Sequence, residues 1–464
     1  MTATLLDRLA YVVGTGNLLV DDESKAKYGT DWTRFYTPAP LGVVMAREVS
    51  QLSRLVGFAR EHHISLVPSG GRTGLSGGAV AANGELVVSF EKMDRIFDFN
   101  EIDQSVTVEA GVITRNLQEF ATRHGFYYPV DFASSGSSQI GGNIATNAGG
   151  IKVVRYGLTR DQIAGLKVVT GTGECLDLNR GLVKNSTGYD LRHLFIGSEG
   201  TLGFVVEATI KLTRGPKDPV VVLLAVPKMT DLISVMRSFK DRMTLLAFEF
   251  FSQKALGHVL SQHDMQPPFD TASNYYALIE FDGGDGDAAN LALEAFDHCV
   301  EAGYATTGII SQSEQQRQDL WRYREFISES ISPYTPYKND IAVRVSRVPE
   351  FLGEVDALVT KRYPAFEIIW FGHIGDGNVH LNILKPDDWS TDDFKRECEQ
   401  VSEEVLGLVR QFEGSVSAEH GIGLLKRDQL GYSRSDQEIR FMRAIKSTFD
   451  PDGVMNPGKL LQWP

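Results

Sequence analysis

Apolar residues in the first part of the chain alternate between strand and helix spacing. Residues 43–80 therefore predict a strand–helix–strand unit. Its helix is indicated by one apolar stripe, which consists of Val49, Leu52, Leu55, Val56 and Ala59. The second strand of the unit, residues 64–67, is predicted to end at Pro68. The residues that follow, 69–78, contain too much glycine for a strand or a helix, so a loop is expected there.

The same kind of pattern continues toward the middle of the chain. Strands are predicted at residues 85–90 and 105–112, and a helix at residues 114–124. Two further glycine-rich stretches follow, at residues 141–150 and 197–203, and both are expected to be loops. This uneven distribution of glycine is the first indication of function.

Residues 214–219, Arg-Gly-Pro-Lys-Asp-Pro, are predicted to form a linker between two domains. Two strand–helix–strand units are expected beyond it, with elements at residues 220–226, 231–240 and 245–251 and at residues 275–281, 287–303 and 306–312. Two such units in one sheet form a ferredoxin-like arrangement, in which the helices cover one face of an antiparallel sheet.

Composition excludes several classes of protein. A chain of 464 residues is too long for one hydrophobic core, and 42% apolar with 23% charged residues are typical of a globular protein. The formal net charge of -14 opposes binding to a phosphate backbone, so no nucleic acid partner is expected. Cys175, Cys299 and Cys398 are too few and too far apart for a disulfide framework, which fits a reducing compartment.

We expect neither a signal peptide nor a membrane span. Asp7 and Arg8 interrupt the apolar residues near the start of the sequence, unlike the apolar region of a signal peptide. The sequence has no run of 18 apolar residues. A cytoplasmic location is therefore predicted, and a homodimer is compatible with the sequence.

Glycine occupies five of the ten positions from residue 69 to residue 78, more than a surface turn needs. Consecutive backbone N–H groups without side chains can surround an anion, and this loop directly follows a predicted buried strand. The alternative is a long flexible loop. The other two stretches offer small polar residues, namely Asn143, Thr146, Asn147 and Ser198. Together, the three stretches predict a ligand with both a pyrophosphate and a wide polar ring.

Two histidines flank the turn sequence Gly375-Asp-Gly-Asn378, which predicts a β-hairpin. If these four residues form the loop, His373 lies opposite His380, with Cβ atoms about 5 Å apart. Asn382 then lies on the same face. Two imidazoles at this separation can bind one metal ion. The alternative is a pair of hydrogen-bonded histidines in the core.

A third metal ligand is expected from Ser417-Ala-Glu-His-Gly-Ile-Gly423. Neighbouring side chains on an extended segment point in opposite directions. One of Glu419 and His420 can therefore bind the metal while the other faces a substrate. Histidine and carboxylate ligands suit Zn²⁺ or a similar divalent ion, and three protein ligands leave a position open for catalysis.

Cationic side chains are candidates for a second carboxylate of the substrate. Arg324 and Ser328 share one face of a predicted helix at residues 321–328, and arginine binds carboxylates with two hydrogen bonds. A metal can chelate a 2-hydroxyl and its neighbouring carboxylate, but a second carboxylate buried in a cleft needs cations of its own. Arg324 and Lys338 could supply them.

The glycine-rich stretches resemble the FAD-binding domain of the vanillyl-alcohol oxidase/p-cresol methylhydroxylase flavoproteins. The similar segments are residues 68–74, 140–150 and 197–203. The resemblance implies that the first stretch wraps the FAD pyrophosphate and that the second borders the isoalloxazine. Some members attach the flavin to a histidine after the first glycine pair. Arg72 and Thr73 stand there in this chain, so non-covalent FAD is expected.

The resemblance extends over nearly the whole chain to the D-2-hydroxyglutarate dehydrogenases and to related D-lactate and glycolate dehydrogenases. It is carried by residues 324–328, 337–338, 372–382, 417–423 and 456–459. It implies that the metal ligands are His373, His380 and Glu419, and that His420 is the base and contacts the substrate. It also implies that Arg324, Ser328 and Lys338 bind the distal carboxylate, with Asn382 near the substrate.

The cofactor-binding residues implied by the resemblance are Pro68, Ser69, Gly70, Gly71, Arg72, Thr73, Gly74, Leu75, Gly78, Gly142, Asn143, Thr146, Asn147, Gly150, Glu199, Gly203, Val205 and Asn456. The implied fold is α+β. It has a two-subdomain FAD-binding domain of vanillyl-alcohol oxidase type and a ferredoxin-like α+β substrate (cap) domain that carries the metal site. The expected boundaries are an N-terminal segment at 1–35, the FAD-binding domain at 36–215, the cap domain at 216–425 and a C-terminal segment at 426–464 that returns to the flavin.

The implied reaction is oxidation of D-2-hydroxyglutarate to 2-oxoglutarate, with hydride transfer from C2 to flavin N5. The implied electron acceptor is an electron-transfer flavoprotein or a quinone-linked carrier. The nearest alternative is another D-2-hydroxy-acid dehydrogenase, acting on D-lactate, glycolate or D-malate. A zinc hydrolase, in which Glu419 or His420 activates water, and a ligand-binding module without catalysis are alternatives of other classes.

Overall fold

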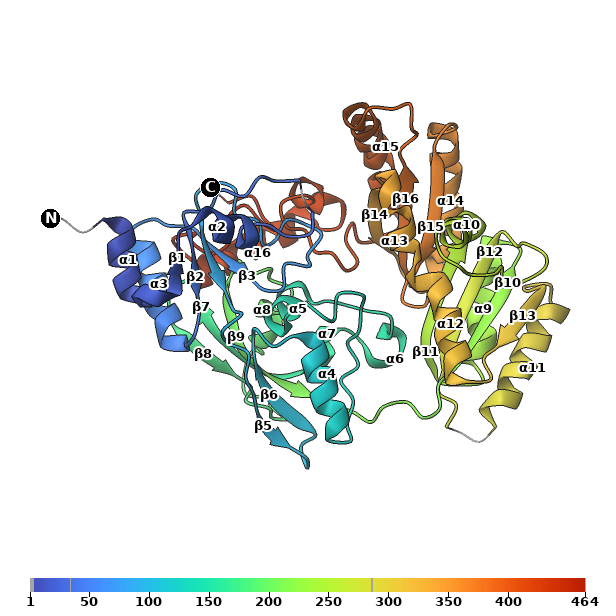
Figure 1. Cartoon of the computed structure of the whole chain (residues 1–464), viewed down its shortest axis with the longest axis horizontal. Coiled ribbons are helices and arrows are strands. Elements are labelled where there is room, and N and C mark those ends of the chain that lie inside the picture. Colours follow the sequence, from blue (N-terminus) through green and yellow to red (C-terminus); the bar gives the residue numbers. More distant parts are fainter. Residues whose placement is uncertain (1–3, 34, 285–286, 464) are drawn as a thin grey trace. The chain divides into compact units, whose positions relative to one another are not determined.

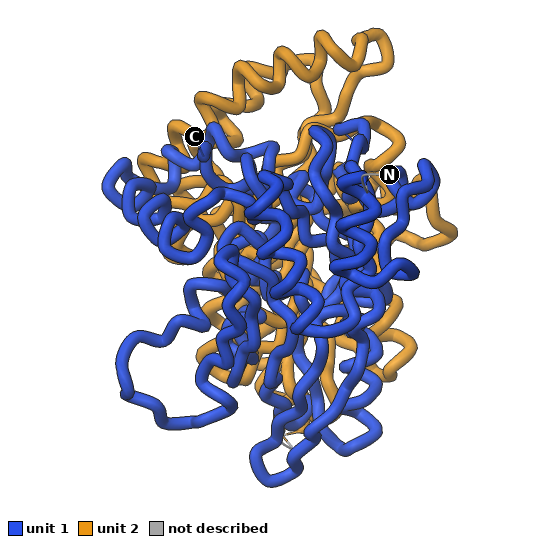
Figure 2. Tube along the Cα trace, turned by 90° about the vertical axis from the view of Figure 1, so that its left-hand side faces the viewer, with its two compact units in different colours: residues 1–150, 157–215, 419–464 blue, residues 151–156, 216–418 orange. Residues whose placement is uncertain are grey.

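The computed structural model describes residues 4–33, 35–284 and 287–463. The chain divides into two compact units, which Figure 2 distinguishes by colour. Unit 1 consists of residues 1–150, 157–215 and 419–464, and unit 2 of residues 151–156 and 216–418. Both units combine helices with mainly antiparallel or mixed sheets, which confirms the predicted α+β class.

The first sheet of unit 1 has four strands in the order β1-β2-β4-β3. Their bounds are Leu18–Leu19 for β1, Gly42–Met45 for β2, Leu66–Ser69 for β3 and Leu86–Ser89 for β4. Strands β2 and β3 both run parallel to β4, because helix α3, Val49–Glu61, carries the chain back between them. Leu52, Leu55 and Val56 of α3 are buried, so the predicted strand–helix–strand unit is confirmed.

Strand β3 contains Pro68, so the prediction that the strand ends before this proline is wrong. The strand lies at the edge of the sheet. A proline, which has no backbone N–H to donate, is tolerated in an edge strand because only one side of the strand pairs with another strand of the sheet. The C-terminal segment reaches this edge: Leu66 pairs with Met455, and Asn456 donates its N–H to the carbonyl oxygen of Leu66 at 2.8 Å.

The second sheet of unit 1 has five antiparallel strands in the order β5-β6-β9-β7-β8. Their bounds are Ile96–Asn100, Ser105–Glu109, Ile163–Thr170, Cys175–Leu178 and Gly203–Lys211 for β5 to β9 in chain order. Helix α4, Thr114–Arg123, packs Leu117 and Ala121 into the core of this sheet. Further helices of unit 1 are α1 (Leu5–Val13), α2 (Asp22–Tyr28), α7 (Thr159–Gln162), α8 (Arg192–Phe195), α16 (Asp436–Phe449) and the 3-10 helices η1 (Thr15–Asn17) and η5 (Arg427–Tyr432).

The second glycine-rich stretch begins as a helix and not as the predicted loop. Ile140–Thr146 form helix α5, and Ile140 and Ile144 are buried in the core of the second sheet. Gly141 permits this close packing, because a Cβ there would lie 2.6 Å from the Cβ of Ala110. Glycine at this position serves helix packing, which the composition of the stretch alone does not reveal.

Unit 2 is built on a seven-stranded sheet in the order β13-β10-β12-β11-β15-β16-β14 (Figure 1). The bounds are Val220–Val226, Leu245–Ser252, Tyr275–Phe281, Thr307–Ile310, Tyr337–Ala342, Glu367–Gly372 and Asn378–Leu384 for β10 to β16 in chain order. Strands β10 to β13, with α9 (Leu232–Lys240) and α11 (Ala288–Glu301), form the predicted ferredoxin-like arrangement. Strands β14 to β16 extend this sheet. The turn at residues 375–378 predicts a hairpin of the β15–β16 kind, but the sequence pattern does not predict that it joins this sheet.

Further helices of unit 2 are α6 (Val153–Tyr156), α10 (Gln253–Gln262), α12 (Glu314–Glu325), α13 (Ile327–Ile331), α14 (Val348–Arg362), α15 (Thr391–Gln411) and the 3-10 helices η2 (Met229–Asp231), η3 (Ser332–Tyr334) and η4 (Val345–Arg347). The helix predicted at residues 321–328 is divided at Phe326, between α12 and α13. Within the described ranges, no helix is long and apolar enough to cross a membrane.

Candidate functional site

The first glycine-rich stretch follows β3 and is held firmly by its neighbours. Gly71 has no room for a side chain, because a Cβ there would lie 2.2 Å from the carbonyl oxygen of Ser137. Arg72 has a φ of 60° and donates hydrogen bonds to the carbonyl oxygen of Gly70 and to Glu91 Oε1, both at 3.0 Å. These contacts favour a rigid anion-binding loop over the flexible alternative.

The second and third glycine-rich stretches lie side by side in unit 1. Gly197 donates its N–H to the carbonyl oxygen of Ile144 at 3.0 Å, and Glu199 donates to that of Ala145 at 2.8 Å. Both acceptors belong to α5, so the third stretch is attached directly to the helix that opens the second. The two stretches can therefore contact one ligand together.

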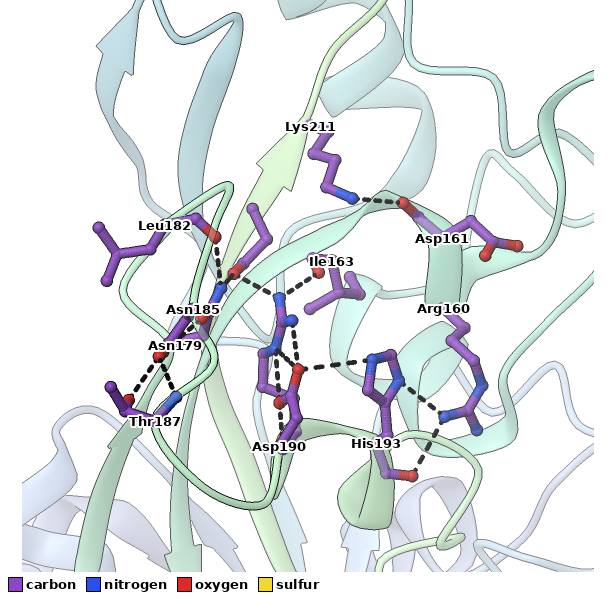
Figure 3. A network of polar contacts seen from close by, with 12 residues as sticks. Arg160, Asp161, Ile163, Asn179, Leu182, Asn185, Thr187, Asp190, His193 and Lys211 are labelled. Atoms are coloured by element: carbon purple, nitrogen blue, oxygen red, sulfur yellow. Dashed lines mark hydrogen bonds and ion pairs between the residues drawn. The ribbon is translucent and has the colours of Figure 1, made fainter.

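Arg160 supports this arrangement, and Figure 3 shows its contacts with His193. Its backbone N–H donates to Asn147 Oδ1 at 3.0 Å, directly after α5. Its guanidinium donates to the carbonyl oxygens of His193 at 3.1 Å and Ile196 at 2.8 Å, at the end of α8. Asp190 lies 3.6 Å from the imidazole of His193 and connects the preceding loop to the same network. The network fixes the point at which the third stretch begins.

The C-terminal segment joins the first and third stretches through Asn456. The Asn456 Nδ2 donates to the carbonyl oxygens of Gly78 at 2.9 Å and Glu199 at 2.7 Å. Among the described residues, the buried Asn456 Oδ1 has no hydrogen-bond partner, and neither has the buried Gln139 Oε1, beside Gly70. A buried acceptor without a donor costs about 1–3 kcal/mol. Both oxygen atoms therefore indicate a polar ligand, and the residues present fit FAD.

Several predicted cofactor residues have hydrogen-bond partners inside unit 1. Asn143 Nδ2 donates to Thr114 Oγ1 at 2.7 Å, and Thr146 Oγ1 donates to the carbonyl oxygen of Gly142 at 3.0 Å. The others lie in β3 (Pro68 and Ser69), in the loop after it (Thr73, Gly74 and Leu75), at the end of the second stretch (Gly150) and in β9 (Gly203 and Val205). Their contact with FAD stays a prediction.

The segment that carries His420 is bound by the third glycine-rich stretch. Glu199 accepts hydrogen bonds from the backbone N–H groups of Ile422 at 2.8 Å and Gly423 at 2.7 Å. Its carboxylate is buried, and this burial raises the pKa of Glu199, although the two N–H donors act in the opposite direction. The backbone that follows His420 is thus attached to the predicted flavin site within unit 1.

The register of the β15–β16 hairpin in unit 2 differs from the predicted one. His380 pairs with Phe371, whereas His373 lies in the connection after β15. The predicted four-residue loop is wrong because the connection is longer and passes through Gly377. Gly377 has a φ of 90°, and a Cβ there would lie 2.1 Å from the carbonyl oxygen of Val343. The imidazoles of His373 and His380 nevertheless meet, with ring centroids 5.3 Å apart.

Each of these imidazoles faces a buried carboxylate. His373 Nδ1 lies 2.8 Å from Glu249 Oε1, and His380 Nδ1 lies 3.7 Å from Asp340 Oδ1. In metal sites, a carboxylate at one ring nitrogen commonly fixes the tautomer in which the other nitrogen binds the metal. The donor set fits a divalent cation, and a pair of hydrogen-bonded core histidines stays the alternative.

Glu419 and the residue before it, Ala418, each take part in a hydrogen bond with a distant part of the chain. The Glu419 Oε1 accepts the N–H of Gly150 at 3.2 Å. The preceding residue, Ala418, donates its N–H to the carbonyl oxygen of Asp340 at 3.3 Å, and Asp340 lies opposite His380 in the β14–β16 pair. The role of Glu419 as a third metal ligand stays a prediction.

Lys338 and Asn382 lie opposite each other on β14 and β16. Asn382 is buried, and within the described ranges its Nδ2 has no hydrogen-bond partner. Lys338 forms no ion pair with any described residue, and desolvation of its ammonium group lowers the pKa of Lys338 even though part of the side chain is exposed. A cation without a counter-ion beside an unsatisfied amide is suited to bind a carboxylate.

Arg324 and Ser328 differ from each other in their surroundings. The Arg324 Nε donates to Glu249 Oε2 at 2.9 Å, and the guanidinium lies 4.8 Å from the centre of the Phe371 ring. Ser328 is exposed on α13. The charge of Arg324 is therefore balanced by Glu249 before any substrate binds, and the binding roles of Arg324 and Ser328 stay predictions.

The two carboxylates behind the histidines are not predicted from the sequence. A signal for Glu249 is present, because it is the one charged residue in the apolar strand Leu245–Ser252, and a buried charge needs partners. Asp340 gives no comparable signal, because its strand, Tyr337–Ala342, is polar at several positions.

Two family models match the chain. Residues 40–179 match the FAD binding domain, and residues 215–460 match the C-terminal domain of FAD linked oxidases. The first range includes the first two glycine-rich stretches, and the second includes both histidines and residues 419–423.

Curated relatives cover almost the full length of the chain. A D-2-hydroxyglutarate dehydrogenase from Stutzerimonas stutzeri is 55% identical over 98% of this chain and 98% of the relative. One from Xanthomonas citri pv. viticola is 52% identical over 94% of this chain and 92% of the relative. A relative from Schizosaccharomyces pombe, named as a mitochondrial D-lactate dehydrogenase, is 30% identical over 97% of this chain and 88% of the relative.

Solved structures show the fold. p-Cresol methylhydroxylase superposes with a TM-score of 0.76 at 15% identity, covering 98% of this chain and 96% of that one. The 4-ethylphenol oxidase from Gulosibacter chungangensis gives a TM-score of 0.75 at 15% identity, covering 99% and 97%. These similarities confirm the fold predicted from the glycine-rich stretches.

Proposed function

We propose a reaction from one premise: the chain belongs to the family of FAD-linked oxidases that includes the D-2-hydroxyglutarate dehydrogenases. It is therefore an FAD-dependent oxidoreductase, and the predictions of its family and of FAD as cofactor are confirmed. We propose that it oxidises D-2-hydroxyglutarate to 2-oxoglutarate and that a divalent metal ion takes part.

The observation that carries the choice of substrate is the β14–β16 strand pair of unit 2. His380 and Asn382 lie two residues apart on one face of β16, which separates them by about 7 Å along the strand. Lys338 stands opposite Asn382, at the end of this row away from the histidines. A hydroxy acid bound at the histidines would thus need a second carboxylate to reach Lys338, which supports a dicarboxylate over D-lactate.

The roles of the chain's own residues follow from their chemistry. His420 takes the proton of the 2-hydroxyl on a ring nitrogen, because a neutral imidazole has a nitrogen lone pair that can accept a proton. Lys338 and Asn382 hold the distal carboxylate, with Arg324 and Ser328 as further candidates. His373, His380 and Glu419 would hold the cation, which supplies a Lewis acid for the 2-hydroxyl and its neighbouring carboxylate. The glycine-rich stretches and Asn456 would hold FAD, which supplies the acceptor for the hydride from C2.

The remaining parts of the proposal concern partners and place. We propose an electron-transfer flavoprotein or a quinone-linked carrier as the acceptor of the flavin electrons, and a cytoplasmic location. FAD binding accounts for the three glycine-rich stretches. A zinc hydrolase would have no use for them, so this alternative explains less of the sequence. The D-lactate alternative is supported by the similarity to the Schizosaccharomyces pombe relative and needs an experiment.

The experiment is anaerobic bleaching of the flavin with a panel of D- and L-2-hydroxy acids. Purified protein, with and without added zinc, is mixed with each acid and the flavin absorbance is followed. We expect the fastest bleaching with D-2-hydroxyglutarate and little with its L-enantiomer, and we expect EDTA treatment to abolish bleaching until zinc is restored. Faster bleaching with D-lactate would move the assignment to the alternative, and full activity of metal-free protein would remove the cation.

A further inference from the structure

We propose, on the basis of the function proposed above, that Glu249 is a positioning residue that holds a metal ligand and a substrate-binding arginine at the same time. It lies behind the site in unit 2 and contacts His373 and Arg324. The metal site and the site for the distal carboxylate would then depend on one buried side chain.

Glu249 stands in an unusual place for a charged residue. It belongs to β11, in which every residue is buried, and its side chain is 1% exposed. Removal of a carboxylate from water costs several kcal/mol, and a well-packed apolar side chain often gives equal or greater stability. The stability of the sheet alone therefore does not account for a glutamate at this position.

The two carboxylate oxygens of Glu249 have different partners. Oε1 lies 2.8 Å from His373 Nδ1, and Oε2 accepts a hydrogen bond from Arg324 Nε at 2.9 Å. His373 follows β15 and Arg324 lies on α12, so the two partners come from separate elements. A rotation of the carboxylate would disturb both contacts, which couples the two partners to each other.

Each contact has a chemical consequence for the proposed reaction. A carboxylate at Nδ1 of His373 stabilises the tautomer that presents Nε2 to a cation and fixes the orientation of the ring. At Arg324 the carboxylate occupies Nε, so a substrate carboxylate would be bound by the two terminal amino groups of the guanidinium. The ring of Phe371, under the guanidinium, adds a second constraint on its position.

Glu280 offers a matched control in the same sheet. It is 0% exposed on β12 and accepts hydrogen bonds from Arg317 at 2.7 Å and from the Trp321 indole at 3.3 Å. Both donors lie on α12, the helix that also carries Arg324. Glu280 is thus a buried carboxylate with an arginine partner, and its hydrogen bonds go to Arg317 and Trp321 instead of His373 and Arg324.

The test compares Glu249→Gln with Glu280→Gln in the full-length flavoprotein. Zinc affinity is measured by competition with a chromophoric chelator, and KM is measured for D-2-hydroxyglutarate and D-lactate. We expect Glu249→Gln to weaken zinc binding by about 10–100-fold. We expect its KM for the dicarboxylate to rise by about 10-fold or more, with a much smaller rise for D-lactate. Glu280→Gln should change neither quantity by more than about 3-fold, since its contacts lie elsewhere.

A second variant guards against misfolding. Glu249→Asp keeps the charge but is too short to reach both partners, so we expect weaker zinc binding in a protein with normal flavin content and circular dichroism. Unchanged zinc affinity in both Glu249 variants, or an equal loss in Glu280→Gln, would overturn the positioning role. Failure of the proposed function would look different, because the unaltered protein itself would then bind no zinc or leave its flavin oxidised with every 2-hydroxy acid.

Discussion

Two cations of unit 2, Lys338 and Arg324, carry the same charge in different electrostatic surroundings. Glu249 balances the charge of Arg324, whereas no described residue forms an ion pair with Lys338. A bound carboxylate would therefore gain more net attraction from Lys338 than from Arg324. The charge count that predicts two cations from sequence is incomplete, because the partner of Arg324 lies 75 residues away along the chain.

Replacement of Lys338 by alanine should separate dicarboxylate from monocarboxylate substrates. A hydrogen bond to a charged group contributes about 1.5–3 kcal/mol, so KM for D-2-hydroxyglutarate should rise by roughly 10–100-fold. KM for D-lactate, which has no second carboxylate, should change by less than about 3-fold. Such a change corresponds to less than about 1 kcal/mol of binding free energy. Steady-state kinetics with both substrates measure the difference, with Lys254→Ala on the exposed surface of α10 as the control. Equal losses for both substrates would show that Lys338 does not bind the distal carboxylate.

At the scale of elements, the hairpin that carries the histidines depends on the backbone of its connection. Gly377 has a left-handed φ, and a Cβ there would lie 2.1 Å from the carbonyl oxygen of Val343. Any other residue at this position would therefore force the backbone to move. Turn composition predicts the hairpin, but it does not reveal the length of the connection, because Val343 comes from a distant part of the sequence. The predicted opposition of His373 and His380 is wrong in register while their proximity is correct.

We expect Gly377→Ala to move the connection and weaken the histidine pair. Strain at such a position costs about 1–3 kcal/mol, which should lower the stability of unit 2, and zinc affinity should fall with it. Gly257 on α10 has open space around it, so Gly257→Ala should raise stability by about 0.5–1 kcal/mol and leave zinc binding unchanged. Chemical denaturation and zinc titration of the two variants provide the comparison. Normal zinc affinity in Gly377→Ala would show that the connection does not position His373.

Local patterns predict the elements of this chain better than they predict its special positions. The apolar stripe of α3 and both strand–helix–strand units of unit 2 can be predicted from the sequence, because buried residues recur there at helical or strand spacing. Pro68 inside β3 and the helix α5 are not visible, because an edge position and a close contact of Gly141 with Ala110 depend on the tertiary fold. The same limit applies to the carboxylates behind the histidines.

At the scale of the molecule, each unit has its own hydrophobic core, so each can respond to its own ligand. FAD should raise the unfolding temperature of unit 1, and zinc that of unit 2. A ligand at 1,000 times its Kd stabilises the state that binds it by about 4 kcal/mol. If Glu419 is a ligand as proposed, zinc should also stabilise unit 1 and bring the two transitions together.

Differential scanning calorimetry with and without each ligand tests this expectation. The variant His373→Ala is the control, because it should lose the zinc response and keep the FAD response. A zinc response confined to unit 2 would leave the two histidines as ligands and remove Glu419. A transition of unit 2 that zinc does not move at all would remove the cation from the proposal.

Unit 1 is built from three separate parts of the chain, residues 1–150, 157–215 and 419–464, so the order of synthesis affects when it can fold. The edge of its first sheet is met by Met455, and Asn456 joins two of the stretches that would hold the flavin. Both residues are translated after the entire continuous part of unit 2, residues 216–418. Domains generally fold as units while they emerge from the ribosome, so unit 2 can mature first. The flavin site must wait for Met455 and Asn456, and cells short of riboflavin should accumulate a colourless chain whose unit 2 is already folded.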